Sequence, residues 1–357
     1  MQRVLQDAAE AMRSHGLTPL RQQTVQRALF ESESLALNLS RSAAAFDLPP
    51  FAPDQLLNED ARAIIPTGFI SETPLLRVLA VRHAIDSVWM PAFVRDFLLL
   101  ALATTTVSEA GNVAFGPEVY ATKAKTDVDV LYSFYSTVVR MKNDLEEIQR
   151  SQPTPFPPCQ VALDDARLLS SLYQQEQIGI VITSPPYPNE KDYTRTTRLE
   201  TVLLGYLKSK SDLRQLKEGL LRSNTRNVFV KDDDDRYVAD ITSVQAVARE
   251  IEAKRIELGK TSGFERLYHR VTTLYFGGMY RHFASLMPHL RPGARCAYVV
   301  GDQQSFFRVH IATAQLLADV ALKAGFKVEG VETWRNRFAS ATQRHIEENV
   351  LILRKPE

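Results

Sequence analysis

The segment Val181-Ile182-Thr183-Ser184-Pro185-Pro186-Tyr187 decides how this chain folds. A short β-branched run ends there in a Ser-Pro-Pro-Tyr turn. Two consecutive prolines have no backbone N–H to donate, and their rings fix φ at about −65°. The turn therefore neither extends the strand nor begins a regular helix, and it forms a rigid corner. In an open α/β sheet, ligands bind at the carboxyl ends of the strands, so we expect a binding site at this corner.

The residues around the corner predict an α/β sheet. Ile178 to Ile182 is the apolar run of a central parallel strand. Residues 160–164 resemble a preceding strand that ends in an acidic turn, with a helix over 165–175. Downstream, strand and helix patterns continue to alternate, which predicts a doubly wound sheet. The expected elements are a helix at 264–290, a strand at 295–302, a helix at 309–324 and two strands at 326–334 and 349–354.

The first part of the chain has a different pattern. Residues 1–150 are expected to be mostly helical, and four prolines within 151–158 mark a domain boundary. Residues 151–357 then form the α/β region. Within it, residues 208–262 are predicted to be a polar insertion and a candidate for DNA sequence recognition. Its acidic run, Lys231 to Arg236, is interpreted as a solvated loop in preference to a metal site.

Composition excludes several classes of protein. The 357 residues are 45% hydrophobic, which suits a sizeable buried core, and the net charge of +1 argues against a polybasic binder. Two cysteines do not make a disulfide framework. The start of the chain shows no signal-peptide pattern, and the longest apolar stretch is too short to span a bilayer. We expect a cytoplasmic protein with no membrane contact.

The corner offers a hydroxyl, carbonyls and an aromatic ring, which suit a planar base that carries an exocyclic amine. Here the sequence resembles the amino-group DNA methyltransferases, whose catalytic motif reads Asp/Asn/Ser-Pro-Pro-Tyr/Phe. The likeness covers residues 160–205 and 265–357 and is loose over the first 150. It implies a partial Rossmann-like α/β methyltransferase sheet and S-adenosylmethionine as the methyl donor.

The resemblance also assigns roles at the corner. Ser184 and the carbonyl of Pro185 would accept hydrogen bonds from the amine, Pro186 would stiffen the turn, and Tyr187 would stack on the flipped base. A serine at the first position favours N4 of cytosine over N6 of adenine. Asp165, with Asp164 as second choice, lies where the family contacts the cofactor, although a helix cap is the alternative. Thr183 is another candidate cofactor contact.

One expected feature is missing from the sequence. The family carries a glycine-rich loop after its first strand, where the backbone approaches the cofactor closely. No such loop is found here. The family sheet runs 3-2-1-4-5-7-6, and this chain supplies strands 3 to 7, so the strand with the corner lacks its neighbour. Either a companion polypeptide supplies the missing part, or the N-terminal helices cover the gap, or the chain is a degenerate relative. We favour the companion.

Several arginines are candidate DNA contacts. Two follow the corner, and three are expected in the loop between the last strands, where surface charge is the alternative. They are Arg195, Arg198, Arg335, Arg337 and Arg344. No histidine pair has metal-ligand spacing, so no metal is expected. Two other functions remain open, namely a non-catalytic DNA-binding or scaffolding subunit and an amino-group methyltransferase for RNA or protein.

Overall fold

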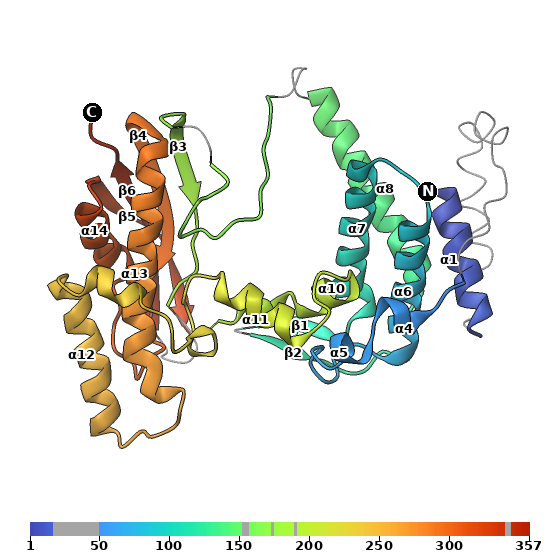
Figure 1. Cartoon of the computed structure of the whole chain (residues 1–357), viewed down its shortest axis with the longest axis horizontal. Helices are drawn as coiled ribbons and strands as arrows, with labels where there is room; N and C mark the ends of the chain where they lie inside the picture. The colour runs from blue at the N-terminus through green and yellow to red at the C-terminus, as the bar shows by residue number, and fades with distance from the viewer. Residues whose placement is uncertain (17–49, 117, 152–156, 173–174, 189–190, 340–343) are drawn as a thin grey trace. The chain divides into compact units, whose positions relative to one another are not determined.

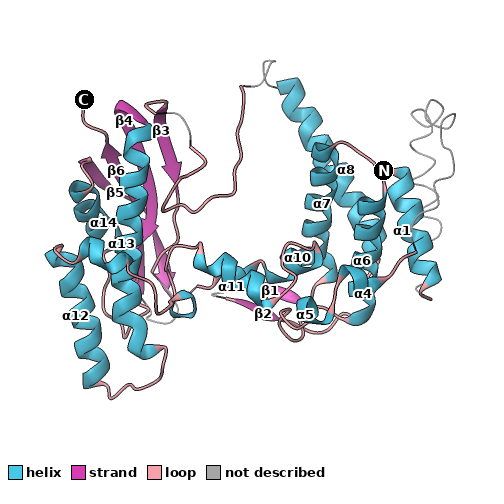
Figure 2. Ribbon diagram, viewed as in Figure 1, coloured by secondary structure: helices cyan, strands magenta, loops and turns pink. Residues whose placement is uncertain are grey.

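The chain folds into two compact units (Figure 1). The computed structural model describes residues 1–16, 50–116, 118–151, 157–172, 175–188, 191–339 and 344–357. The first unit comprises 1–158 with 193–214, and the second comprises 159–192 with 215–357. Figure 2 shows that the first unit is mainly helical and that the large sheet lies in the second. The predicted fold class, an α/β chain with a helical N-terminal region, is confirmed.

The first unit packs around α6, which is buried on most sides. Its neighbours α1, α7 and α8 contact it directly. Pro91 stands at the N-cap of α7, as its fixed φ favours at a helix start. The elements of this unit are α1 (Gln2–Ser14), α4 (Pro53–Leu56), α5 (Glu59–Arg62), α6 (Glu72–Ser87), α7 (Ala92–Thr105), η1 (Thr106–Ala110), β1 (Val113–Phe115), β2 (Val119–Ala121), α8 (Val130–Ser151), α9 (Tyr193–Thr196) and α10 (Arg198–Leu203).

Residues 193–214 belong to the helical unit, although the sequence placed them in the α/β region. Leu199, Val202 and Leu203 of α10 are buried there. Gly111 leaves room for Leu199, since a Cβ on that glycine would lie 2.8 Å from Leu199 Cδ2. The predicted division at residue 150 thus misses a segment that returns to the first unit. The apolar pattern of residues 193–214 does not indicate which of the two cores this segment joins.

The second unit is built on a four-stranded mixed sheet in the order β3-β4-β6-β5. The strands are β3 (Ile178–Thr183), β4 (Leu290–Gly301), β5 (Lys327–Ala339) and β6 (Arg344–Arg354). β3 and β4 are parallel, with Thr183 opposite Tyr298, and the other pairs are antiparallel. This order agrees with the 4-5-7-6 half of the sheet that the resemblance implies.

Helices cover one face of this sheet. Inward-facing Cys296, Tyr298 and Val300 of β4 are fully buried, in a core shared with α13 (Tyr268–Leu286) and α14 (Thr313–Lys323). Figure 1 shows α13 lying along the strands. α12 (Thr242–Glu257) packs on both of these helices. The remaining elements are α11 (Lys210–Glu218), which continues from the first unit, and the short helices η2 (Thr225–Asn227), η3 (Asp234–Val238), η4 (Glu265–Leu267) and η5 (Met287–His289).

The opposite face and the β3 edge of the sheet are open. Ile180 and Ile182 are 71% and 78% exposed, and the side chains that follow on this face, Val299 and Ile352, are only half-buried. Among the described residues β3 pairs with β4 alone. Native proteins rarely leave an apolar edge strand in this condition, because it pairs readily with another chain.

Two predicted elements before β3 are wrong. Residues 160–164 form no strand, and 165–172 form turns where a helix was expected. Val161 and Leu163 are 93% and 99% exposed. A strand exists only with a partner to accept its hydrogen bonds, and the expected position of this one is separated from β3 by strands that the described residues do not contain. The apolar residues of this segment were therefore misleading.

Residues 208–262 were predicted to be a polar insertion, but residues 215–262 pack into the second unit. Val238, Val244 and Ile251 lie in the core of the second unit. Gly277 of α13 lets this segment pack closely, because a Cβ on it would lie 1.8 Å from the carbonyl oxygen of Asp234. Deleting the segment would therefore open the core.

No helix in the described parts of the chain is both long enough and apolar enough to cross a membrane.

Candidate functional site

The Ser-Pro-Pro-Tyr corner lies where β3 ends beside β4. Ser184 Oγ lies 3.1 Å from the carbonyl oxygen of Val299, to which it donates. A hydroxyl has one proton, so this bond leaves the Ser184 oxygen as an acceptor. Ser184 is exposed, whereas both prolines are half-buried. The corner thus presents a fixed acceptor at the carboxyl end of β3, which suits an amine N–H.

Tyr187 packs across the end of β4. Its ring lies against Gly301, where an added Cβ would be 3.2 Å from Tyr187 Cε2 and 3.4 Å from Glu348 Cγ. The Tyr187 hydroxyl is 3.4 Å from Ser184 Oγ. A side chain at position 301 would push the Tyr187 ring away from the strand by a few tenths of an ångström. The aromatic ring and the acceptor oxygen are therefore held side by side by β4.

The acidic turn before β3 is held by its own residues. The Asp165 carboxylate accepts from Arg167 through Nε and Nη2, the latter at 2.7 Å. Asp164 accepts from Ser170 Oγ and from the backbone N–H of Ser171, and these bonds lower its pKa to about 2. Asp165 was a candidate cofactor contact, but both of its oxygens face Arg167, so it would have to share them. Thr183 lies at the end of β3, half-buried.

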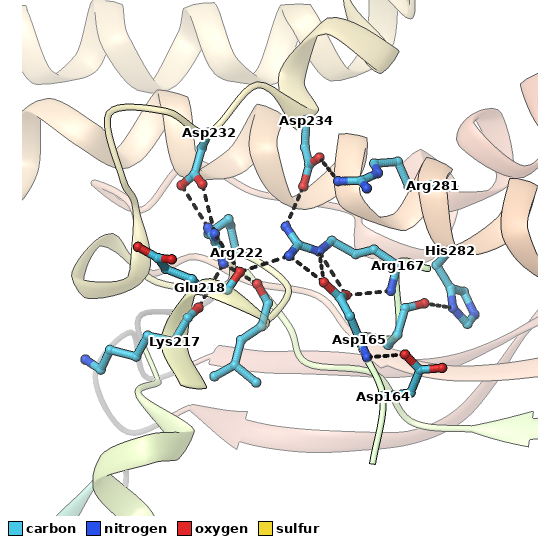
Figure 3. A network of polar contacts seen from close by, with 12 residues as sticks. Asp164, Asp165, Arg167, Lys217, Glu218, Arg222, Asp232, Asp234, Arg281 and His282 are labelled. Atoms are coloured by element: carbon cyan, nitrogen blue, oxygen red, sulfur yellow. Dashed lines mark hydrogen bonds and ion pairs between the residues drawn. The ribbon is translucent and has the colours of Figure 1, made fainter. Parts of the chain in front are cut away.

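A buried ion-pair network joins this turn to the acidic run (Figure 3). Arg167 Nη1 donates to Asp234 at 2.9 Å, and Arg281 of α13 donates to the other oxygen of Asp234 at 2.6 Å. Alongside, Arg222 binds both oxygens of Asp232 at 2.8 Å. The prediction of a solvated loop is wrong for both aspartates. Composition shows that an acidic run exists, but it does not show which basic side chains pair with it in the fold.

His282 fastens the same turn to the sheet. Its Nδ1 is 2.7 Å from the carbonyl oxygen of Ala166, and its Nε2 is 2.8 Å from the Tyr298 hydroxyl. A carbonyl only accepts, so Nδ1 carries the proton and Nε2 accepts from Tyr298. Burial lowers the pKa of His282, which favours this neutral form. Sequence spacing gave no signal of the His282 contacts or of the Arg167–Asp234 pair, because these contacts join residues remote along the chain.

Asp302 follows β4 directly beyond Gly301. Its carboxylate accepts from the Thr313 backbone N–H at 3.1 Å and lies 3.1 Å from His310 Nε2. Burial raises the pKa of Asp302, while His310 opposes the shift. A buried acid at the carboxyl end of the strand beside the corner is a further candidate site residue. A Gly-Asp pair after a predicted strand was its signal in the sequence.

The candidate DNA-binding arginines separate into two groups. Arg195 and Arg198 lie in the first unit, and Arg198 is buried there, with its guanidinium donating to Thr194 and to the carbonyl of Ile64. Arg198 is thus a structural residue and not an exposed phosphate contact. Arg335 and Arg337 lie in β5 rather than in a loop, because the last two strands are longer than predicted. Arg344 begins β6, and its side chain lies outside the described part.

The described residues do not fit S-adenosylmethionine by themselves. The acidic turn is already engaged by Arg167 and the serines. None of the described glycines of the second unit lies in a loop that leads from a strand into a helix, where the backbone could approach a ligand closely. In the described part, His, Cys, Asp and Glu side chains form no group suited to a metal ion.

Sequence comparison identifies distant relatives. Type II methyltransferase M.BsoBI of Geobacillus stearothermophilus is 27% identical over 238 residues, covering 62% of this chain and 46% of that protein. Type II methyltransferase M.AvaI, from a Nostoc strain and from Anabaena variabilis, is 27% identical over 168 residues, covering 44% of this chain and 33% of that protein. The chain therefore spans less than half the length of these relatives. No family model and no solved structure matches it.

Proposed function

We propose that this chain is the base-binding, catalytic part of an S-adenosylmethionine-dependent DNA methyltransferase that acts on an exocyclic amine. The observation that carries the proposal is the corner itself, in which Ser184 donates to Val299 and so turns an acceptor oxygen outward beside Tyr187. The two relatives carry the name of Type II methyltransferases, which supports the same reaction class.

The corner would act by orienting the amine. The lone pair of an aromatic amine is delocalised into its ring, so the nitrogen is a poor nucleophile. Hydrogen bonds from the amine to Ser184 Oγ and to the Pro185 carbonyl would direct that lone pair out of the ring plane. Tyr187 would stack on the extrahelical base. S-adenosylmethionine, when bound, supplies an electrophilic methyl group. A serine at the first position makes N4 of cytosine the preferred target.

Ser184→Ala tests the corner. A hydrogen bond to a group that gains charge contributes about 1.5–3 kcal/mol, so kcat of the assembled enzyme should fall by at least about tenfold. The matched control is Ser108→Ala, because Ser108 is also exposed and also donates to a backbone carbonyl, that of Thr104, at 2.9 Å. Unchanged kcat in the Ser184 variant would sink the assigned role.

We also infer that a companion polypeptide completes the sheet. β3 presents an apolar strand edge, and the relatives are more than twice as long as their matched segments. The companion would supply the missing strands together with the glycine-rich cofactor loop. A DNA-binding subunit without catalysis is the second candidate, favoured only by the incomplete cofactor site.

The handedness of crossovers supports this inference. Strand β3 reaches β4 through α12 and α13, which cover one face of the sheet. Parallel crossovers are right-handed almost without exception. A strand added at the free edge of β3 belongs to the other half of a doubly wound sheet, so its crossover helix covers the opposite face. That face carries Ile180 and Ile182, which are exposed here.

Calorimetry on the isolated chain tests the companion. We expect no S-adenosylmethionine binding at micromolar concentrations, because the described residues provide no close backbone approach to the cofactor. The obligate interface that completes the sheet should exceed about 2,000 Å². Micromolar binding by a monodisperse monomer would show that the pocket is complete without a companion.

A further inference from the structure

The end of the β5–β6 hairpin projects past the edge of the sheet where the corner lies. β4 ends at Gly301, opposite Glu348, and the next residue, Asp302, still donates its backbone N–H to Glu347. β5 and β6 go on pairing with each other as far as Ala339 and Arg344. Four residue pairs at about 3.3 Å each carry the hairpin about 13 Å beyond β4. Ser184 binds the carbonyl of Val299, two residues before β4 ends. The hairpin and the corner therefore share one edge.

The base of this projection holds two arginines on one carboxylate. Glu348 has a side chain only 7% exposed, and its Oε2 accepts from Arg335 Nε at 2.5 Å. Arg337 Nε lies 3.8 Å from Oε1 of the same carboxylate. The side chains of Arg335 and Arg337 are 58% and 41% exposed. One negative charge for two positive charges leaves this point cationic, and contacts through Nε leave the terminal nitrogens for an outer ligand.

Large aromatic side chains lie next to these cations. Trp334 is 59% exposed, and the Arg335 guanidinium lies 4.5 Å from its ring centroid. Phe338 is 53% exposed and makes an edge contact with His345. An exposed aromatic beside arginine is the usual platform for a nucleotide, because bases stack on the ring while phosphates accept from the cation.

Gly301 connects this patch to the corner. A Cβ at this glycine would meet both Tyr187 and Glu348, so the two side chains lie on the same face of the sheet. Arg335 is the cross-strand partner of Glu348 and follows on that face. Three strand spacings of about 4.8 Å separate β3 from β5, or about 14 Å. Phosphates of one DNA strand advance by about 3.4 Å per nucleotide, so the patch lies about four nucleotides from a base held at the corner.

We propose that Trp334, Arg335 and Arg337 bind the DNA strand that flanks the target base. The two arginines donate to phosphates, and Trp334 stacks against a nucleotide exposed beside the extruded base. Glu348 holds both guanidiniums toward the same side before DNA arrives, which reduces the ordering cost of binding. This inference rests on the proposed function and adds the flanking strand to it as a second contact.

Fluorescence anisotropy with a labelled duplex and the full chain tests the arginines. Replacing both, in Arg335→Ala/Arg337→Ala, should weaken binding by about tenfold at low salt and reduce the slope of log K against log salt by about two. The matched control is Arg295→Ala, because Arg295 lies on the same sheet in the middle of β4, is 67% exposed and pairs with Glu329 at 2.9 Å. The control should keep the wild-type slope.

Tryptophan emission tests the stacking. The chain has two tryptophans, so Trp89→Phe leaves Trp334 as the reporter. Saturating DNA should quench its emission, Trp334→Phe should retain binding, and Trp334→Ala should lose it. A wild-type slope in the double arginine variant, unchanged emission at saturation, or no DNA binding by the wild-type chain would each overturn the inference. If any of these outcomes is found while the assembled enzyme still methylates DNA, only this inference fails and the proposed function stands.

Discussion

Asp234→Asn should destabilise the second unit strongly. The Asp234 side chain is 4% exposed and lies between Arg167 Nη1 at 2.9 Å and Arg281 Nη1 at 2.6 Å. Removing one partner of a buried ion pair costs about 3–5 kcal/mol, because the remaining charges stay buried without compensation. Asparagine keeps the shape and one acceptor oxygen, so we expect the lower end, about 3 kcal/mol. With a urea m-value of about 2 kcal/mol/M, the unfolding midpoint falls by about 1.5 M.

The neighbouring residue provides the control. Asp233 is 59% exposed and pairs with Arg236 at 2.9 Å. A surface pair contributes about 0–1 kcal/mol, so Asp233→Asn should shift the midpoint by less than about 0.5 M. Unfolding is followed by Trp334 emission in the Trp89→Phe background, because Trp334 reports on the second unit by itself. Equal midpoints for the two variants would refute the reasoning and return the acidic run to a solvated loop.

Three further predictions concern the pH dependence, the close packing and the open face. Burial lowers the pKa of His282, so the stability that the neutral ring contributes is present above the unfolded pKa of about 6.5 and is lost as the pH falls below it. The urea midpoint should therefore drop between about pH 7 and pH 5.5. The drop should be smaller in His282→Gln. Gly277→Ala should lower the free energy of unfolding, followed by circular dichroism, by about 3 kcal/mol or more, because its Cβ would lie 1.8 Å from the Asp234 carbonyl oxygen. The control, Gly330→Ala, should leave it almost unchanged, because a Cβ there has nothing within 4 Å. Ile182→Lys should leave the urea midpoint of the isolated chain unchanged, since that side chain is 78% exposed. The same variant should no longer co-purify with the companion. Intact assembly would argue against the open face as the interface.

The sequence predicted the sheet well where local pattern and packing agree. β3 has the predicted bounds, and its corner lies at the carboxyl end of the sheet. The sequence could not show that Ser184 donates to Val299, because the register of β3 against β4 is a long-range property. It likewise missed Glu348, whose burial depends on Gly301 and Tyr187.

Other predictions failed for identifiable physical reasons. Val161 and Leu163 have strand composition but no partner strand among the described residues, so they remain exposed. Asp232 and Asp234 look solvated in sequence, yet arginines ten or more residues away pair with them. Arg335 and Arg337 were placed in a loop, whereas β5 continues through both, because β6 pairs with it as far as Ala339. These outcomes depend on strand partners and ion-pair partners that the local sequence pattern does not show.

Nucleoside mass spectrometry of DNA tests the central proposal most directly. The chain would be co-expressed with the neighbouring reading frames of its own genome, and the DNA digested and analysed for methylated bases. The account predicts N4-methylcytosine with the wild-type chain and at least about fivefold less with Tyr187→Ala, because losing a stacking ring costs about 1–3 kcal/mol per base while the fold persists. N4-methylcytosine at the wild-type level in Tyr187→Ala, or its absence under the wild-type chain, would contradict it.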